Sequence, residues 1–264
     1  MYLKDHPNIF MSEVKEPHYF AQDMHMIAEY IDDHEKYYAL FENAGQEHVA
    51  VGESSVWYLS SEIALENIKK FNPRAKIIVM VRNPIEMAIS LHSHLLHSRD
   101  EVEPDFEKAW NLQGAREQGK HIPTTCSRPQ FLQYGKVCRL GSQVERLLSI
   151  FPSDCVKLIL LEELSKDPRK VYLDLLEYLG APFDNRVEFP RFNENKVVKS
   201  TWIAEKLKYP PSAINILKKI LHVKSLHLWK IIDRHNAAFE PIAHYKLITF
   251  IKFLDERRQV LPII

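Results

Sequence analysis

The fold is decided by the stretch KIIVMVRNPIEMAISLHSHLL, residues 76–96. Its first part, Lys76 to Val81, is a continuous apolar run of the kind found in a parallel strand that is covered on both faces. The helical pattern that follows starts at Pro84, which suits the first turn of a helix because its missing N–H would have no partner there anyway. The stretch therefore predicts a strand, a short loop and a helix.

The same order of elements recurs later in the chain. A second strand is predicted at Val156 to Leu161, followed by a helix at Asp167 to Leu179 that stops at Gly180. This alternation predicts an α/β fold in which a parallel sheet is flanked by helices. We expect residues 1–264 to form one domain with a helical C-terminal extension over 203–264. Other helices are expected at 60–70, 105–117 and 128–150.

Composition excludes several classes of protein. The 264 residues are 45% hydrophobic and 27% charged, which is typical of a folded chain rather than a disordered one. The charges cancel, with 35 basic and 35 acidic residues, so the whole chain has no excess of positive charge for nucleic acid. No apolar stretch is long enough for a membrane span, no signal peptide is recognisable, and the three cysteines form no C-x-x-C pair. We expect a cytoplasmic protein with reduced thiols.

Charge is unevenly distributed along the chain. Residues 1–66 hold 3 basic and 13 acidic residues, whereas residues 191–234 hold 10 basic and 3 acidic residues. The early part of the basic stretch, NENKVVKST, has the composition of a loop, and a basic loop suits an anion. Lys196 and Lys199 are therefore candidates for anion binding.

The end of the first predicted strand is a candidate phosphate site. Ligands of open parallel sheets bind beyond the carboxyl ends of the strands, where a helix N-terminus also offers free N–H groups. Arg82 lies at this point, and Ser90 follows eight residues later, a little over two helical turns. Both side chains could reach one phosphate, although an arginine before Asn-Pro is also common in an ordinary turn.

Several ordered motifs resemble the sulfotransferase family. In the 3′-phosphate-binding segment of that family, a strand delivers an arginine followed by a proline, and a serine comes eight residues after the arginine, as Arg82 and Ser90 do here. The resemblance covers roughly residues 2 to 202 and is closest to bacterial members and to the carbohydrate branch. Its other motifs include HPNIFMSEVKEPHYF (6–20), GESSVWYL (52–59), FEKAW (106–110), QYGKVCRLGSQVERLLSIFP (133–152), VKLILLEELSKDPRKVYLDLLEYLGAP (156–182) and FPRFNENK (189–196).

The resemblance implies transfer of a sulfuryl group from 3′-phosphoadenosine 5′-phosphosulfate (PAPS) to a hydroxyl or amine, which leaves 3′-phosphoadenosine 5′-phosphate (PAP) and needs no metal. Arg82 and Ser90 would bind the 3′-phosphate. Glu16 matches the general base of the carbohydrate branch, with His18 as the alternative base. The acceptor would lie near His18 and near Glu53, Trp57 and Tyr58. Sugar, lipid, peptide and polyketide acceptors all stay open.

The sequence also departs from the family pattern. Family members begin with a strand and a lysine-containing, glycine- and threonine-rich loop around the 5′-phosphosulfate, whereas this chain starts at the segment that follows them. Ser54 stands where some members carry a catalytic lysine, and Leu161 stands where the phenol and steroid branch stacks a tyrosine on adenine. The family's later loop around the 3′-phosphate would fall near 193–200 and include Lys196 and Lys199. We expect the chain to be truncated at its start.

Two alternatives follow from these departures. The chain could be a natural remnant that binds a nucleotide or a partner without catalysis. It could instead be a P-loop kinase, for which Glu162 would be the carboxylate that binds magnesium. A zinc site is not expected, because His92, His94 and His97 do not share one helix face.

Overall fold

The computed structural model describes residues 2–24, 31–190, 194–198, 237–243 and 250–252. The chain divides into two compact units. The first consists of Met1–Pro84, Arg139–Pro190 and Lys246–Ile264, and the second consists of Ile85–Cys138 and Arg191–Tyr245. The prediction of one domain stays a prediction.

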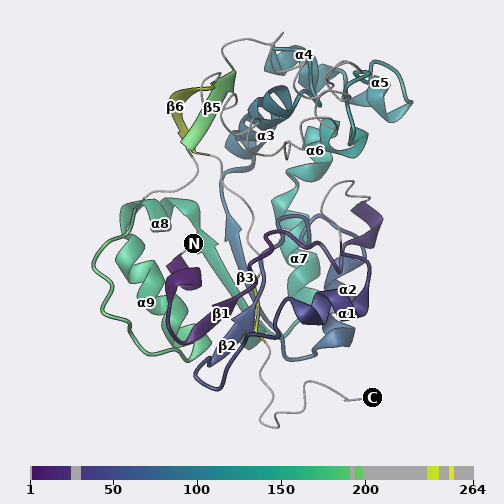
Figure 1. Ribbon diagram of the computed structural model, residues 1–264. Coiled ribbons are helices and arrows are strands. Elements are labelled where there is room, and N and C mark those ends of the chain that lie inside the picture. Colours follow the sequence, from purple (N-terminus) through teal and green to yellow (C-terminus); the bar gives the residue numbers. More distant parts are fainter. Residues whose placement is uncertain (1, 25–30, 191–193, 199–236, 244–249, 253–264) are drawn as a thin grey trace, which may run out of the picture. The chain divides into compact units, whose positions relative to one another are not determined.

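The first unit is built on parallel strands (Figure 1). Strand β1 (Ile9–Met11) pairs in parallel with β2 (Ala50–Gly52), and β3 (Lys76–Val81) pairs in parallel with β4 (Val156–Leu160). Strand β7 (Phe250–Lys252) is antiparallel to β3 and also contacts β2. The two strands predicted from apolar runs are confirmed, although the second ends one residue early.

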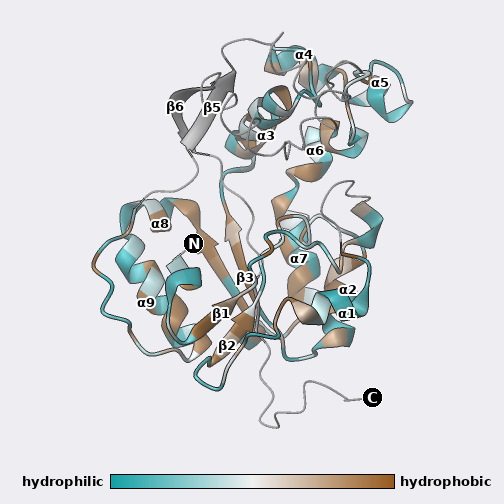
Figure 2. Ribbon diagram, viewed as in Figure 1, coloured by the Kyte–Doolittle hydropathy of each residue, from teal (hydrophilic) through white to brown (hydrophobic). Residues whose placement is uncertain are grey.

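Burial explains why the apolar run of β3 forms a strand. Ile77, Ile78 and Val79 are all buried, and Ile78 packs with Ile159 of β4 in the core. Figure 2 shows hydrophobic residues along β1, β2 and β3. A parallel strand of this kind needs cover on both faces. Figure 1 shows α8 (Leu161–Lys166) and α9 (Pro168–Leu179) on one side of the strands and α2 (Ala64–Phe71) and α7 (Leu140–Ile150) on the other.

Helix α9 follows its sequence signals closely. The Asp167 side chain accepts a hydrogen bond from the amide of Lys170 and caps the first turn. Gly180 ends the helix with φ of 70°, a left-handed conformation that glycine adopts without a steric penalty. The remaining helices in the described part of the unit are short: η1 (Tyr2–Asp5), η2 (Gln22–Met24), α1 (His34–Ala39) and η4 (Ser153–Cys155).

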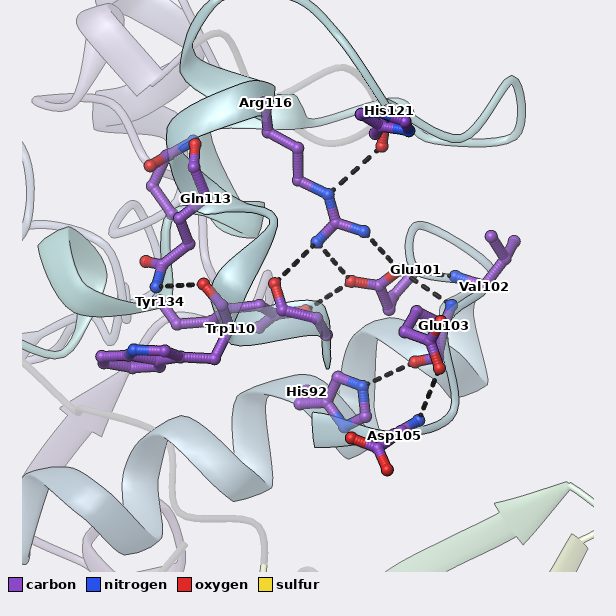
Figure 3. Close-up of polar contacts among 12 residues, drawn as sticks. His92, Glu101, Val102, Glu103, Asp105, Trp110, Gln113, Arg116, His121 and Tyr134 are labelled. Carbon is purple, nitrogen blue, oxygen red and sulfur yellow. Dashed lines mark hydrogen bonds and ion pairs between the residues drawn. The ribbon is translucent and has the colours of Figure 1, made fainter. Parts of the chain in front are cut away.

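The second unit holds most of α3 (Pro84–Ser98), the helix that begins three residues after β3 ends. It also contains α4 (Phe106–Asn111), α5 (Gln113–Glu117), η3 (Pro129–Leu132), α6 (Tyr134–Val137) and the antiparallel pair β5 (Glu194–Val198) and β6 (Ala237–Ala243). Figure 3 shows the polar centre of its helical part, a buried ion pair between Arg116 and Glu101. Tyr134 donates a further hydrogen bond to Glu101 over 2.7 Å.

Several predicted helix boundaries need correction. The helix expected over 105–117 is two helices that meet at Leu112, and the one expected over 128–150 is broken into η3, α6 and α7. A contact distant in sequence explains one break, because the Gln113 side chain accepts the amide hydrogen of Gly135 and starts α6 anew. Part of the expected loop NENKVVKST is strand β5. The described parts of 203–264 are the strands β6 and β7, which differ from the helical extension predicted there.

Candidate functional site

Two loops meet at the carboxyl ends of β1 and β2. Because these strands are parallel and paired in register, the segments that follow them leave the sheet at the same edge. The Glu16 amide donates a hydrogen bond to the Ser54 carbonyl over 3.0 Å, and the His18 amide donates to the Ser55 hydroxyl over 3.0 Å. The two loops are thereby joined, so the segments that hold the residues predicted at 16–18 and at 53–58 lie side by side.

The loop after β1 presents Glu16 beside His18. Their Oε2 and Nε2 atoms lie 3.5 Å apart, and the Glu16 side chain is 21% exposed whereas that of His18 is 4% exposed. Nδ1 of His18 is buried and has no hydrogen-bond partner among the residues that the structure describes. A partly exposed carboxylate with an imidazole behind it is an arrangement that can accept a proton from a bound molecule.

The backbone of this loop is in an unfavourable conformation. Glu16 has φ of 56° and His18 has φ of 51°, in the left-handed region that residues with a Cβ atom rarely adopt. Such conformations persist only where surrounding contacts hold them, and they are found more often at functional sites than elsewhere. The hydrogen bonds from both amides to the loop after β2 are contacts of that kind.

The loop after β2 supplies the buried carboxyl group of Glu53. Glu53 has no exposed surface, and its oxygens accept hydrogen bonds from the Tyr58 hydroxyl over 2.5 Å and from the Ser55 hydroxyl over 2.9 Å. Burial raises the pKa of Glu53 to about 7, although the hydrogen bonds from Tyr58 and Ser55 oppose this effect and the charge of Glu16 adds to it.

The other residues predicted around the acceptor differ in exposure. Trp57 is partly exposed, so its ring can contact a bound molecule, whereas Tyr58 is fully buried. The Glu53 side chain has no exposed surface either. Its carboxyl group could contact an acceptor only if part of it were exposed. The predictions of acceptor contact for His18 and Trp57 stay predictions.

A group of aromatic side chains that was not predicted from the sequence includes Tyr19, three residues after Glu16. The Tyr19 ring stacks on the Tyr37 ring with centroids 4.1 Å apart, and the Tyr19 hydroxyl pairs with Nδ1 of His34 over 2.9 Å. Tyr37 is fully buried and Tyr19 is not. The bridging hydroxyl of Ser55 was missed from the sequence, where the only signal is its position two residues after Glu53.

The residues predicted to bind the donor lie on other elements of the structure. Arg82 is the first residue after β3, and Ser90 lies on α3 with 6% of its surface exposed. Arg82 thus places a cation at the carboxyl end of a parallel strand, which suits a phosphate. Lys196 lies on β5, and Lys199 lies outside the described residues. Joint binding of one phosphate by these residues stays a prediction.

The histidines of α3 include one with a partner inside the protein. His92 pairs through Nε2 with the Glu103 carbonyl over 2.8 Å, a contact drawn in Figure 3. Within the described ranges, no group of three His, Cys, Asp or Glu side chains is placed to hold a metal ion. Glu162 is exposed in the first turn of α8.

No helix in the described part of the chain is both long and apolar enough to cross a membrane.

Comparisons with known proteins agree with the motifs. The chain matches the family model of the sulfotransferase domain over residues 3–220. It is also similar to the crystal structure of a sulfotransferase from Alicyclobacillus acidocaldarius, with 27% sequence identity and a TM-score of 0.62. That similarity covers 87% of this chain and 91% of the other. A search of curated proteins found no match.

Proposed function

Because the chain belongs to the sulfotransferase family, we propose that it transfers a sulfuryl group from PAPS to a hydroxyl or amine with Glu16 as the general base. The observation that carries this proposal is the placement of the Glu16 carboxylate. It is partly exposed, it lies 3.5 Å from the His18 imidazole, and it stands where the parallel strands β1 and β2 end. A positioned carboxylate of this kind can take the acceptor's proton as the new bond forms.

The proposed reaction is a displacement at sulfur. The acceptor oxygen or nitrogen forms a bond to sulfur while the bond from sulfur to the bridging oxygen of PAPS breaks, and PAP leaves with that electron pair. Glu16 removes the acceptor's proton. Arg82 and Ser90 would hold the 3′-phosphate, with Lys196 and Lys199 as further candidates, because cationic and hydroxyl donors stabilise phosphate charge.

The acceptor side of the proposal rests on the loop after β2. Trp57 and the Tyr19 ring both keep exposed surface, and aromatic faces of this kind pack well against the apolar faces of sugars and other ring compounds. A carbohydrate acceptor is therefore part of the proposal. A cytoplasmic location is also proposed. It is supported by the three cysteines, Cys126, Cys138 and Cys155, which are odd in number and form no C-x-x-C pair, a pattern that argues against a disulfide framework.

The experiment is a transfer assay with radiolabelled PAPS and a panel of sugar, phenol and amine acceptors. Glu16→Gln removes the proposed base but keeps the size of the side chain. Loss of a general base lowers turnover by about 100-fold or more. The matched control is Glu13→Gln, since the Glu13 side chain is 82% exposed and pairs with Lys4 at the surface. Equal turnover in Glu16→Gln and in the wild type would exclude Glu16 as the base.

A further inference from the structure

We propose that Glu53 is a positioning residue, which fixes the loop that carries Glu16 and His18 through the hydroxyl groups of Ser55 and Tyr58. The inference rests on the proposed function, since it concerns the same site. It also reassigns Glu53, which the sequence placed against the acceptor. Glu53 has no exposed surface, and both of its oxygens are engaged within the protein.

Two chains of hydrogen bonds, called relays here, connect the Glu53 carboxylate through a hydroxyl group to the backbone amides of His18 and Phe20. In the first, Ser55 donates its hydroxyl proton to Glu53 Oε2 and accepts the His18 amide hydrogen over 3.0 Å. In the second, Tyr58 donates to Glu53 Oε1 and accepts the Phe20 amide hydrogen over a longer 3.5 Å. The carboxylate therefore touches neither amide itself.

The direction of these hydrogen bonds requires an acceptor at Glu53. A hydroxyl has one proton to donate. Above its pKa of about 7, Glu53 is ionised, and an ionised carboxylate can only accept. Because both hydroxyls donate their hydrogen bonds to Glu53, the oxygen lone pairs of Ser55 and Tyr58 are available to accept hydrogen bonds from the two amides. In Glu53→Gln, one of the two oxygens is replaced by an NH2 group, which is a donor. The hydroxyl that faces this group can no longer donate to residue 53 and would have to donate to another acceptor.

The loop needs this support because its backbone is unfavourable. The His18 amide belongs to a residue with φ of 51°, and Glu16, with φ of 56°, is held by a neighbouring hydrogen bond to Ser54. A left-handed residue with a Cβ atom relaxes when its contacts are removed. Loss of the relay would therefore move the Glu16 carboxylate away from the acceptor rather than change the donor site at Arg82.

The first test is hydrogen exchange of single amides in Glu53→Gln at a pH well above 7, where Glu53 of the wild type is ionised. This measurement does not depend on activity. The His18 amide is expected to exchange at least about 10-fold faster than in the wild type, while the amides of β3 keep their protection. Ser55→Ala removes the bridge with a smaller change and is expected to give the same result at His18. The control is Glu66→Gln, an exposed glutamate on α2. Unchanged exchange at His18 in both variants would overturn the proposal.

Kinetics with the acceptor found in the transfer assay supply the second test. We expect kcat of Glu53→Gln to fall at least about 10-fold while its affinity for PAP stays within about 2-fold of the wild type. Glu53→Gln and Ser55→Ala share one relay, so the double variant should lose little more than either single variant. If the fold-loss of kcat in the double variant equals the product of the losses in the two single variants, the two residues act independently and the relay is contradicted. If the wild type shows no sulfuryl transfer, the proposed function is refuted. The role of Glu53 in holding the loop would still be decided by the hydrogen-exchange measurement.

Discussion

The buried ion pair of the second unit allows a quantitative prediction. Arg116 contacts Glu101 through two nitrogens, at 2.6 and 2.8 Å, and the two side chains are 2% and 0% exposed. Glu101 also accepts hydrogen bonds from the amides of Val102 and Glu103 and from the Tyr134 hydroxyl. Arg116→Met would leave this carboxylate buried without its cation.

The expected loss follows from the burial of the pair. Removal of one partner of a buried pair costs about 3–5 kcal/mol, because the other charge stays in the interior. For a chain of this length, 1 kcal/mol corresponds to roughly 2–4 °C in Tm, so Arg116→Met should unfold on the order of 10 °C lower. Burial raises the pKa of Glu101, but the hydrogen bonds from Arg116 and the two amides outweigh it and lower the pKa. The difference between variant and wild type should therefore shrink in acid, where Glu101 in the variant becomes protonated.

Thermal unfolding followed by circular dichroism measures this difference. In the double variant Glu101→Gln, Arg116→Met, the glutamine oxygen can still accept from the amides of Val102 and Glu103, so it should be more stable than Arg116→Met alone. Lys136→Met is the control, because the ion pair of Lys136 with Glu117 is exposed and should leave Tm unchanged. A loss under about 1 kcal/mol in Arg116→Met, or a double variant less stable than Arg116→Met, would refute this reasoning.

Two further predictions concern stability. Burial raises the pKa of Glu53 to about 7, so the folded state binds this proton more tightly than the unfolded state does. The stability of the wild type relative to Glu53→Gln should therefore fall by about 3 kcal/mol as the pH rises from about 4.5 to above 7, as chemical denaturation at several pH values would show; a flat difference would exclude the raised pKa. Gly180→Ala should destabilise the protein by about 1 kcal/mol because φ is 70° there. Gly141→Ala, on α7 with open space around the added methyl group, should instead stabilise it by about 0.5–1 kcal/mol; effects of the same sign would contradict the assignment of these two positions.

Local signals in the sequence were sufficient for the long elements. The strand at Lys76–Val81, the helix that begins at Pro84 and the helix that ends at Gly180 were predicted because each carries its own apolar pattern or terminal residue. Helix α6 was not separated from its neighbours, because the group that starts it is the side chain of Gln113, more than twenty residues away. Propensity over a short window cannot include such a contact.

The candidate site was only partly predictable for the same reason. Glu16 and Arg82 were identified through family motifs, but the contact between the loops after β1 and β2 depends on two three-residue strands. Strands of that length carry no periodicity that a sequence can display. Ser55 bonds to an amide 37 positions away, so its role becomes visible only when β1 and β2 pair.

The proposed donor site at the carboxyl end of β3 can be tested most directly by calorimetric titration of PAP into the wild type, Arg82→Ala and Arg74→Ala. Arg74 is the matched control because its side chain is 69% exposed and pairs with Asp154 at the surface. We expect micromolar binding by the wild type and Arg74→Ala, and binding weaker by about 10- to 100-fold in Arg82→Ala, since charge-assisted hydrogen bonds contribute roughly 1.5–3 kcal/mol. A folded wild type that does not bind PAP, or an Arg82→Ala variant that binds it as tightly as the wild type, would contradict the assignment of the 3′-phosphate site to Arg82.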